Sequence, residues 1–478
     1  MVDCETRLFI GGKFRDSSDG RRFPVIDPAT GDSLADVADA TVEDGLEAVD
    51  AAAAALGAWG ARPPRERAEI LRKAFDLLIE QEDRFARLMT LENGKPLADS
   101  RAELRYGAEF FRWFSEEAVR NLGTVSIAPA SGARSIVMHR PAGVAVMVTP
   151  WNFPLAMGTR KIAPALAAGC SCVLKPASDT PLTMLALAEL LATAGVPDGV
   201  VNILPSSRTG AVVDAMLHHP AVRVLSFTGS TEVGRSLLKS AADQVLTAHM
   251  ELGGNAPFLV FDDADLDAAV AGALIAKMRN MGEACTAANR FYVQDGIFDA
   301  FTDRLSDAMA ALKVGNGLEE GVKVGPLVDR KALEKVERLV GDAVDRGAHV
   351  RTGGARVGDK GLFYSPTVLS DVPPDAACLS EEIFGPVAPI VRFSDDEEAI
   401  RLANGTEFGL TAYVYTGDLR RGLAVCERLE VGMVGLNRGL VSDPSAPFGG
   451  RKQSGLGREG AHEGLKEYLE TQYISTEW

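Results

Sequence analysis

The first 120 residues show the periodicity of amphipathic helices. Apolar residues recur at helical spacing over residues 42–56, and a second helical pattern covers residues 64–89. Gly94-Lys95-Pro96 interrupts the pattern, and a third amphipathic stretch then ends near Val119. The pattern predicts a layer of α-helices in this part of the chain.

From residue 144 onward, short apolar runs alternate with helical patterns. Continuous apolar runs are typical of buried parallel strands, and the helices between them are typical of crossover connections. The runs cover residues 144–148, 172–174, 200–204, 222–227 and 245–250, with helical patterns at 155–168 and 182–194. The alternation predicts a doubly wound α/β region with a ligand crevice at the carboxyl ends of its strands.

A second α/β region follows, and it is punctuated by Gly315-Asn316-Gly317 and Gly353-Gly354. Two strand-like segments, 124–140 and 468–475, lie outside both alternating regions and predict a small separate sheet. We therefore expect three parts. They comprise residues 1–122 with 141–252, residues 253–449, and residues 123–140 with 450–478.

Composition narrows the classes of function. A chain of 478 residues is too long to fold around a single hydrophobic core. Its composition, with 46% hydrophobic and 24% charged residues, is typical of a soluble globular enzyme. The net charge of −16 argues against a nucleic-acid or anionic-membrane partner, because both require basic surface. No apolar run reaches the ~18 residues of a membrane span. The negative net charge does not exclude an anionic small-molecule substrate. A few arginines close to a binding site attract such a molecule more strongly than a distant acidic surface repels it.

The cysteines indicate a reduced, cytoplasmic protein. Six scattered cysteines are too few for a disulfide scaffold in a chain of this length. Residues 1–15 lack the apolar core of a secretory signal. No C-x-x-C or H-E-x-x-H spacing occurs, so we expect no metal site.

Three side chains are candidates for catalysis. Cys285 lies among glycine and small residues, so a substrate can approach its thiol, although a single cysteine is more often a buried apolar residue. Glu251 ends a predicted strand beside a Gly-Gly turn and is either a general base or a solvated loop acid. Asn152 lies in a proline-flanked turn and is either an oxyanion donor or a turn residue.

Two features indicate a cofactor site. Gly229 and Ser230 belong to a glycine-bearing strand-to-helix turn, which can present backbone amides to a pyrophosphate. Lys175 ends the second buried strand and can pair with hydroxyl or phosphate groups, although alone it equally fits a surface lysine. Each signal is weak by itself.

Together these elements resemble the aldehyde dehydrogenase superfamily over nearly the whole chain. The spacing agrees, because Cys285 follows Glu251 by 34 residues and Asn152 by 133, as in the family. Seven motifs occur in the family's order: PWNFP (150–154), KPAS (175–178), FTGSTEVG (227–234), MELGGNAP (250–257), GEACTAANR (282–290), EEIFGP (381–386) and APFGGRKQSGLGRE (446–459).

The resemblance implies an NAD(P)-dependent oxidation of an aldehyde to an acid. Cys285 forms a thiohemiacetal, which Asn152 and the Cys285 backbone amide stabilise. Loss of a hydride to the nicotinamide leaves a thioester, and Glu251 activates the water that hydrolyses it. The resemblance also implies a set of cofactor-binding residues, namely Trp151, Lys175, Ser178, Gly229, Ser230, Glu382 and Phe384.

For the three parts of the chain, the resemblance implies a Rossmann-type cofactor-binding domain (1–122 and 141–252), an α/β catalytic domain (253–449) and β oligomerisation elements (123–140 and 450–478). A homodimer or homotetramer is expected.

Within the family, the sequence looks most like the succinate-semialdehyde dehydrogenases. In that subfamily, residues matching Arg160, Arg279 and Ser442 hold the distal carboxylate of the substrate, and arginine pairs bidentately with carboxylates. The alternative is that both arginines form structural ion pairs. Arg438 adds a further cation, so other anionic aldehydes, such as glutarate semialdehyde or a sulfonated or phosphorylated aldehyde, stay open.

The cofactor prediction depends on Ser178. NAD-preferring members often carry glutamate here, and its charge repels the 2′-phosphate of NADP. Ser178 is uncharged and lies close to Lys175 in the KPAS motif, so we expect NADP to be accepted, with NAD as the alternative.

Two positions depart from the family pattern. Ala287 replaces a second cysteine that many relatives have, so no local disulfide is expected, and Glu283 replaces a frequent glutamine. An ionised acid near the thiol raises the pKa of that thiol.

Three other functions fit the sequence less well. A CoA-acylating dehydrogenase generally lacks the base that Glu251 supplies. A non-catalytic binding protein of the same fold is expected to have lost one of the three candidate catalytic residues. A thiol hydrolase needs a histidine near the cysteine, and none of the six histidines lies in such a motif.

Overall fold

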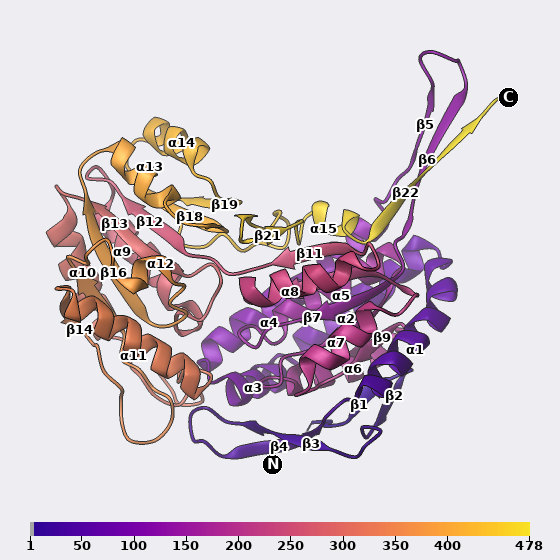
Figure 1. The fold of residues 1–478 in the computed structure, drawn as a ribbon, viewed down its shortest axis with the longest axis horizontal. Helices are drawn as coiled ribbons and strands as arrows, with labels where there is room; N and C mark the ends of the chain where they lie inside the picture. The colour runs from indigo at the N-terminus through magenta and orange to yellow at the C-terminus, as the bar shows by residue number, and fades with distance from the viewer. Residues whose placement is uncertain (1–3) are drawn as a thin grey trace.

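The computed structural model describes residues 4–478, which form two lobes and a projecting arm (Figure 1). Each lobe is built on one large β-sheet, of eight and seven strands, and the arm is a three-stranded sheet. Residues 1–3 of the expected first domain lie outside the described residues. None of the helices in residues 4–478 is long and apolar enough to cross a membrane.

The eight-stranded sheet has the predicted doubly wound topology. Its spatial order is β2-β1-β9-β8-β7-β10-β11-β21, and β9 to β11 run parallel. The chain builds outward from β7 through β8 and β9, and then returns to build β10 and β11 on the other side. The parallel strands are β7 (Val144–Val148), β8 (Ser171–Lys175), β9 (Val201–Ile203), β10 (Val222–Thr228) and β11 (Thr247–Glu251). The switch point therefore lies between β7 and β10, where such folds open their ligand crevice.

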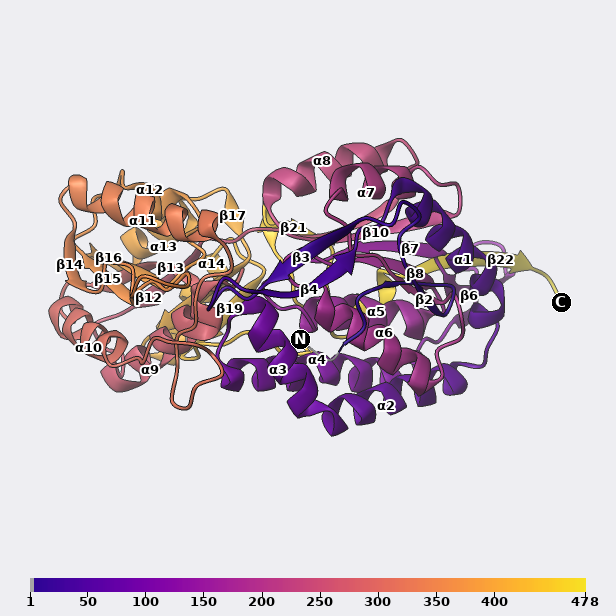
Figure 2. The ribbon, with the colours of Figure 1, turned by 90° about the horizontal axis from the view of Figure 1, so that it is seen from below.

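Helices cover both faces of this sheet (Figure 2). One face carries α1 (Val42–Gly60), α7 (Thr209–Leu217) and α8 (Thr231–Ala242). The other carries α5 (Ala156–Ala168) and α6 (Leu182–Ala194), with an outer layer of α2 (Pro64–Glu80), α3 (Glu82–Asn93) and α4 (Leu97–Ala118). The single helical pattern over residues 64–89 is two helices, because the chain turns at Gln81.

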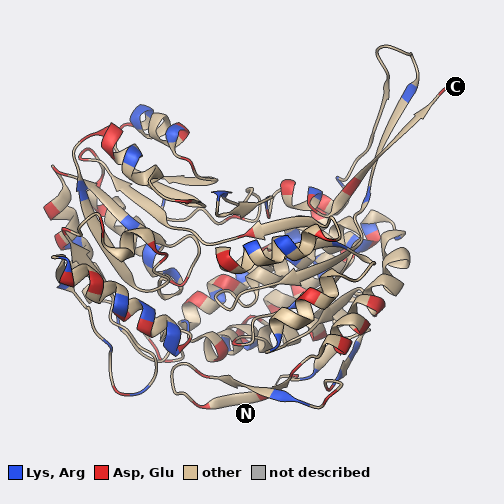
Figure 3. Ribbon diagram, in the orientation of Figure 1, with Lys and Arg blue, Asp and Glu red and all other residues tan. Residues whose placement is uncertain are grey.

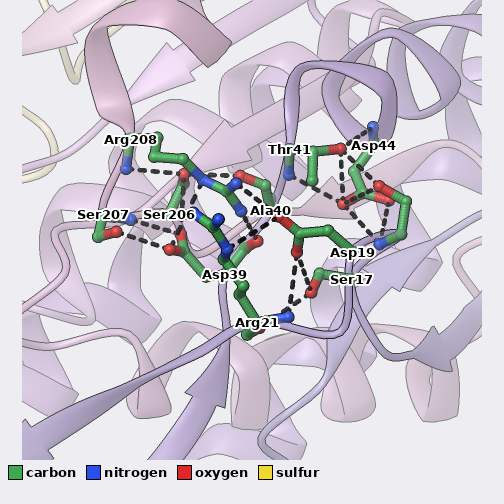
Figure 4. A network of polar contacts seen from close by, with 11 residues as sticks. Ser17, Asp19, Arg21, Asp39, Ala40, Thr41, Asp44, Ser206, Ser207 and Arg208 are labelled. Carbon is green, nitrogen blue, oxygen red and sulfur yellow. Dashed lines mark hydrogen bonds and ion pairs between the residues drawn. The ribbon is translucent and has the colours of Figure 1, made fainter.

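Short N-terminal strands, which the sequence pattern did not indicate, join this lobe. β1 (Leu8–Ile10) and β2 (Lys13–Arg15) extend the sheet, whereas β3 (Arg22–Ile26) and β4 (Ser33–Ala38) form a separate hairpin. A polar network attaches them to the loop after β9 (Figure 4). Asp39 accepts hydrogen bonds from the Ser207 amide and hydroxyl at 2.8 and 2.7 Å, and Arg208 pairs with Asp19 at 2.7 Å.

The seven-stranded sheet forms the second lobe, with the order β14-β15-β16-β13-β12-β18-β19. All its neighbouring strands are parallel except β14 and β15. The strands are β12 (Ala256–Val260), β13 (Ala288–Gln294), β14 (His349–Thr352), β15 (Thr367–Ser370), β16 (Val387–Phe393), β18 (Thr411–Tyr415) and β19 (Met433–Leu436). The helices are α9 (Leu266–Met278), α10 (Phe298–Ala310), α11 (Arg330–Asp345), α12 (Ala377–Ser380), α13 (Asp396–Asn404) and α14 (Leu419–Arg428).

The arm consists of β5 (Thr124–Ile127), β6 (Arg134–Pro141) and β22 (Leu469–Thr476). The sequence analysis grouped all of residues 450–478 with it, but the structure places only β22 there. β20 (Arg451–Lys452) pairs with β17 (Phe408–Gly409), and β21 (Gly455–Leu456) pairs with β11 in the first lobe. α15 (Glu463–Lys466) packs on α5. This segment thus joins the two lobes, because its backbone hydrogen-bonds to strands of both.

Lys and Arg positions alternate with Asp and Glu positions along the helices and loops of both lobes (Figure 3). The chain as a whole has a net charge of −16.

Candidate active site

A cavity of about 320 Å³ opens at the carboxyl ends of β7, β10 and β11, at the switch point of the first sheet. Eight of the predicted site residues line it: Trp151, Asn152, Gly229, Ser230, Glu251, Cys285, Glu382 and Phe384. They come from both lobes, so the cavity lies where the lobes meet. Lys175, Ser178, Arg160, Arg279 and Ser442 are not among its lining residues.

Cys285 reaches this cavity on a loop with unusual backbone angles. The 3₁₀ turn Arg279–Gly282 precedes it, and Asn280 and Met281 adopt left-handed φ angles of 52° and 55°. Gly282 is required there, because a Cβ atom would lie 2.2 Å from the Gly385 carbonyl oxygen. Burial, and then the charge of Glu251, raise the pKa of the Cys285 thiol to about 12, while Arg160 and Arg279 oppose the rise. At rest the group is therefore a thiol.

Glu251 ends β11 and is buried, with only 4% of its surface exposed. Neither carboxylate oxygen has a hydrogen-bond partner among residues 4–478. Burial and the neighbouring Glu459 raise its pKa well above the ordinary value. A buried carboxyl group that lacks partners and faces a cavity is suited to exchange a proton with a bound molecule.

Glu459 lies behind Glu251 and is held by two cations. Its carboxylate pairs with Arg160 Nε and with Lys161 Nζ, both at 2.6 Å. Burial raises the pKa of Glu459, but Arg160 and Lys161 outweigh this effect and leave that pKa below the ordinary value. Glu459 therefore stays charged and disfavours the charge on Glu251.

Asn152 follows β7 and is 4% exposed. Its side-chain Nδ2 donates to the Glu283 carbonyl oxygen at 3.0 Å, which orients the amide next to the cysteine loop. An amide nitrogen carries two hydrogens, so one remains available to a ligand. The sequence suggested that Glu283 could act as an acid near the thiol. In the structure, its carboxylate accepts a hydrogen bond from the Val328 amide at 3.2 Å. The groups that act most on the thiol pKa are Glu251, Arg160, Glu382 and Arg279.

The other end of the cavity is lined by the predicted cofactor-binding residues. Ser230 caps the N-terminus of α8, and a Cβ atom on Gly229 would lie 2.5 Å from the Phe227 ring, so this turn presents bare backbone. The Trp151 and Phe384 rings meet edge to face with centroids 5.4 Å apart. Glu382 accepts from the Gly254 amide at 3.1 Å. These are the residue types that bind a pyrophosphate, an aromatic ring and ribose hydroxyls.

Lys175 and Ser178 follow the neighbouring strand. Lys175 ends β8 and is buried, and burial lowers its pKa to about 8. Ser178 is half-buried in the loop beyond it. An anionic group near Lys175 restores the charge that burial disfavours.

One side of the cavity is formed by residues that the sequence pattern did not indicate. Asp329, Lys331 and Lys335 line it from the N-terminal end of α11, where Asp329 caps the helix. The capping aspartate and the strong amphipathic pattern indicate the helix, but nothing local shows that its first turns face a cavity.

The predicted anion-binding residues form a second cluster. Arg279 donates to the Ser442 hydroxyl at 3.2 Å, and its guanidinium lies over the rings of Phe153 and Tyr106 at 4.8 and 5.6 Å. Within residues 4–478, Arg279 has no carboxylate partner, whereas Arg160 is paired with Glu459. The buried Tyr106 hydroxyl and Arg160 Nη2 have no hydrogen-bond partner in the described chain. Tyr106, which the sequence analysis did not select, thus joins a group of donors without acceptors.

A family model described as the aldehyde dehydrogenase family matches residues 14–474. The chain belongs to the aldehyde dehydrogenase family. This confirms the resemblance found in the sequence and the predicted fold class. The cofactor of this aldehyde dehydrogenase is NAD or NADP.

Known proteins are similar over almost the full length of this aldehyde dehydrogenase. A succinate-semialdehyde dehydrogenase of Paenarthrobacter nicotinovorans is 54% identical, covering 92% of this chain and 98% of the relative. A glutarate-semialdehyde dehydrogenase of Pseudomonas aeruginosa is 51% identical, covering 98% and 97%. A crystal structure of an NADP-dependent enzyme from E. coli has a TM-score of 0.97 at 50% identity, covering 99% and 98%.

The raised pKa of Cys285 generates a test on the enzyme without cofactor. Because only the thiolate reacts, alkylation of Cys285 by iodoacetamide is expected to accelerate roughly tenfold for each pH unit between 7.5 and 9.5. Mass spectrometry of the peptide that contains Cys285 separates this reaction from those of the other cysteines. A rate that is already constant at pH 7.5 would contradict the raised pKa.

Proposed function

We propose that this aldehyde dehydrogenase oxidises succinate semialdehyde to succinate and prefers NADP. The observation that carries the proposal is Arg279, a cation that is hydrogen-bonded to Ser442, stacked on two aromatic rings and without a carboxylate partner in the described residues. A substrate carboxylate supplies that partner. The 54% identical succinate-semialdehyde dehydrogenase supports this choice.

In the proposed reaction, Cys285 first releases its thiol proton to water in the cavity, and the thiolate then adds to the aldehyde carbon. The oxyanion that forms accepts hydrogen bonds from Asn152 Nδ2 and the Cys285 amide. A bound nicotinamide supplies the acceptor for the hydride that leaves this carbon, and Cys285 then carries a thioester. Glu251 takes a proton from a water molecule, the water oxygen bonds to the acyl carbon, and the sulfur departs as thiolate.

The buried position of Glu251 suits this role. Its raised pKa makes it a stronger base than an ordinary carboxylate once it is ionised. Its two oxygens have no partner among residues 4–478, so a water molecule has no competitor for them.

The role of Arg279 is tested with three aldehydes, namely succinate semialdehyde, glutarate semialdehyde and butanal. The change Arg279→Met removes the charge-assisted bond to the carboxylate, so kcat/KM for succinate semialdehyde is expected to fall by roughly 30-fold or more. For butanal, which lacks the carboxylate, kcat/KM is expected to stay within a few-fold of the parent value. Equal kcat/KM values for butanal and succinate semialdehyde in the parent enzyme would contradict the proposal that Arg279 binds the substrate carboxylate.

Glutarate semialdehyde is the second candidate substrate, because a relative named for it is 51% identical. The same aldehydes decide between the two candidates. Arg279 is a cleaner probe than Arg160, since Arg160 also neutralises Glu459 behind the base.

The NADP preference is tested at Ser178. The change Ser178→Glu places a carboxylate near the proposed 2′-phosphate position, so kcat/KM for NADP is expected to fall at least tenfold, with a smaller change for NAD. Ser178→Gln is the matched control, since it adds the same bulk without charge. If the unmodified enzyme turns over NADP at least tenfold more slowly than NAD, the preference is wrong.

We also propose that the arm holds the enzyme as a homodimer or homotetramer. Val125 and Ile127 lie on one face of β5 and are 67% and 58% exposed, which is unusual for paired apolar side chains. The double change Val125→Glu/Ile127→Glu is expected to lower the mass measured by light scattering. The control Thr124→Glu/Ser126→Glu charges the opposite face of the same strand and is expected to keep the mass of the parent.

A further inference from the structure

Lys95 is fully buried beneath the loop that carries Asn152, and the proposed reaction does not use it. Its Nζ donates to the backbone carbonyl oxygen of Asn152 at 2.7 Å and pairs with Glu103 Oε2 at 2.5 Å. The sequence pattern marked Gly94-Lys95-Pro96 only as the point where a helix ends. In the structure, this turn is closely enclosed, because a Cβ atom on Gly94 would lie 2.7 Å from Pro326 and 2.9 Å from Pro28.

Glu103 extends the contact to the helix after Asn152. Its other oxygen, Oε1, accepts from the amides of Leu155 and Ala156 at 2.9 and 3.1 Å, at the start of α5. Lys95 and Glu103 therefore hold both ends of the short turn from Asn152 to Ala156. The Phe153 ring in this turn lies between two cations, Lys95 at 4.4 Å and Arg279 at 4.8 Å.

The second partner of the Asn152 carbonyl comes from the cysteine loop. Asn280 Nδ2 donates to the Asn152 carbonyl at 2.9 Å and to the Glu283 carbonyl at 3.0 Å. The Glu283 carbonyl is also the group that orients the Asn152 side chain. A shift of the Asn152 backbone thus moves its side-chain amide relative to Cys285.

We propose that Lys95 is a positioning residue that fixes the Asn152 backbone, and through it the amide that stabilises the oxyanion. The inference rests on the proposed role of Asn152 at the oxyanion. The physical reason is that a charged donor gives a shorter and stiffer bond to a carbonyl than a neutral donor does. Small misplacements of a stabilising donor reduce the rate steeply, by roughly 100-fold for about 1 Å.

The principal variant keeps the buried charge balanced by changing both partners of the ion pair. Lys95→Met alone leaves Glu103 as an unpaired buried carboxylate and endangers folding. The double change Lys95→Met/Glu103→Gln removes both charges, while the glutamine oxygen still accepts from the first amides of α5. Glu103→Gln alone keeps the bond from Lys95 to Asn152. We expect the double variant to lose roughly 10- to 100-fold in kcat with KM for the aldehyde nearly unchanged, and Glu103→Gln to lose much less.

The decisive measurement is a double-mutant cycle that combines the Lys95 variant with Asn152→Ala. When two residues act as one unit, their effects on the activation free energy are not additive. In the Asn152→Ala background, Lys95→Met/Glu103→Gln is expected to lower kcat less than twofold further. A purely structural loss would instead multiply with the loss from Asn152→Ala. The matched control is Lys277→Met, which removes another fully buried lysine amine, one that donates to Asn289 at 3.0 Å. Its effect on kcat is expected to be the same in both backgrounds.

Three results would overturn the inference. If Asn152→Ala lowers kcat strongly but the double variant keeps parent kcat, or if their losses multiply, Lys95 does not act through Asn152 and the proposed function stands. If Asn152→Ala itself keeps parent kcat, the proposed oxyanion role fails and the positioning role of Lys95 fails with it.

Discussion

The thiol of Cys285 and the carboxyl group of Glu251 share one buried cavity, and the surrounding structure controls how easily each of them loses its proton. Burial is the largest cause of the raised pKa of each group. The charge of Glu459 adds to it at Glu251, and the charge of Glu251 adds to it at Cys285. Arg160 and Arg279 oppose these effects at the thiol. Arg279 is also the residue proposed to bind the anionic tail of the substrate. Substrate binding and ionisation of the nucleophile therefore depend in part on the same charge.

The arrangement of the sheets brings these groups together. Glu251 ends β11 and Asn152 follows β7, so the first sheet presents both at its carboxyl edge near the switch point. Cys285 comes from the other lobe, on a loop whose left-handed residues bend it toward that edge. The segment that contains β20 and β21 pairs with both lobes. It supplies Glu459 behind the base, so the same stretch of chain joins the lobes and balances charge in the cavity.

Much of the fold and of the candidate site could be predicted from the sequence. The continuous apolar runs predicted the parallel strands of the first sheet, since buried strands need no polar alternation. The motifs around Asn152, Glu251 and Cys285 indicated the family, and the cavity contains all three. The N-terminal strands were missed because they are short, and the chain after residue 450 was grouped wholly with the arm. Backbone pairing between segments some 200 residues apart, as between β11 and β21, leaves no local periodicity.

The residue types proposed for the reaction, and their order along the chain, could be predicted from the sequence, because a nucleophile, a base and an amide donor have recognisable local motifs. Which neighbours act on these residues follows from the fold alone. Glu283 turns its carboxylate to the Val328 amide, Arg160 already has Glu459 as a partner, and Lys95 donates to the Asn152 carbonyl. The reason is physical: pKa shifts and orientations depend on distance and burial, and these are properties of the folded chain.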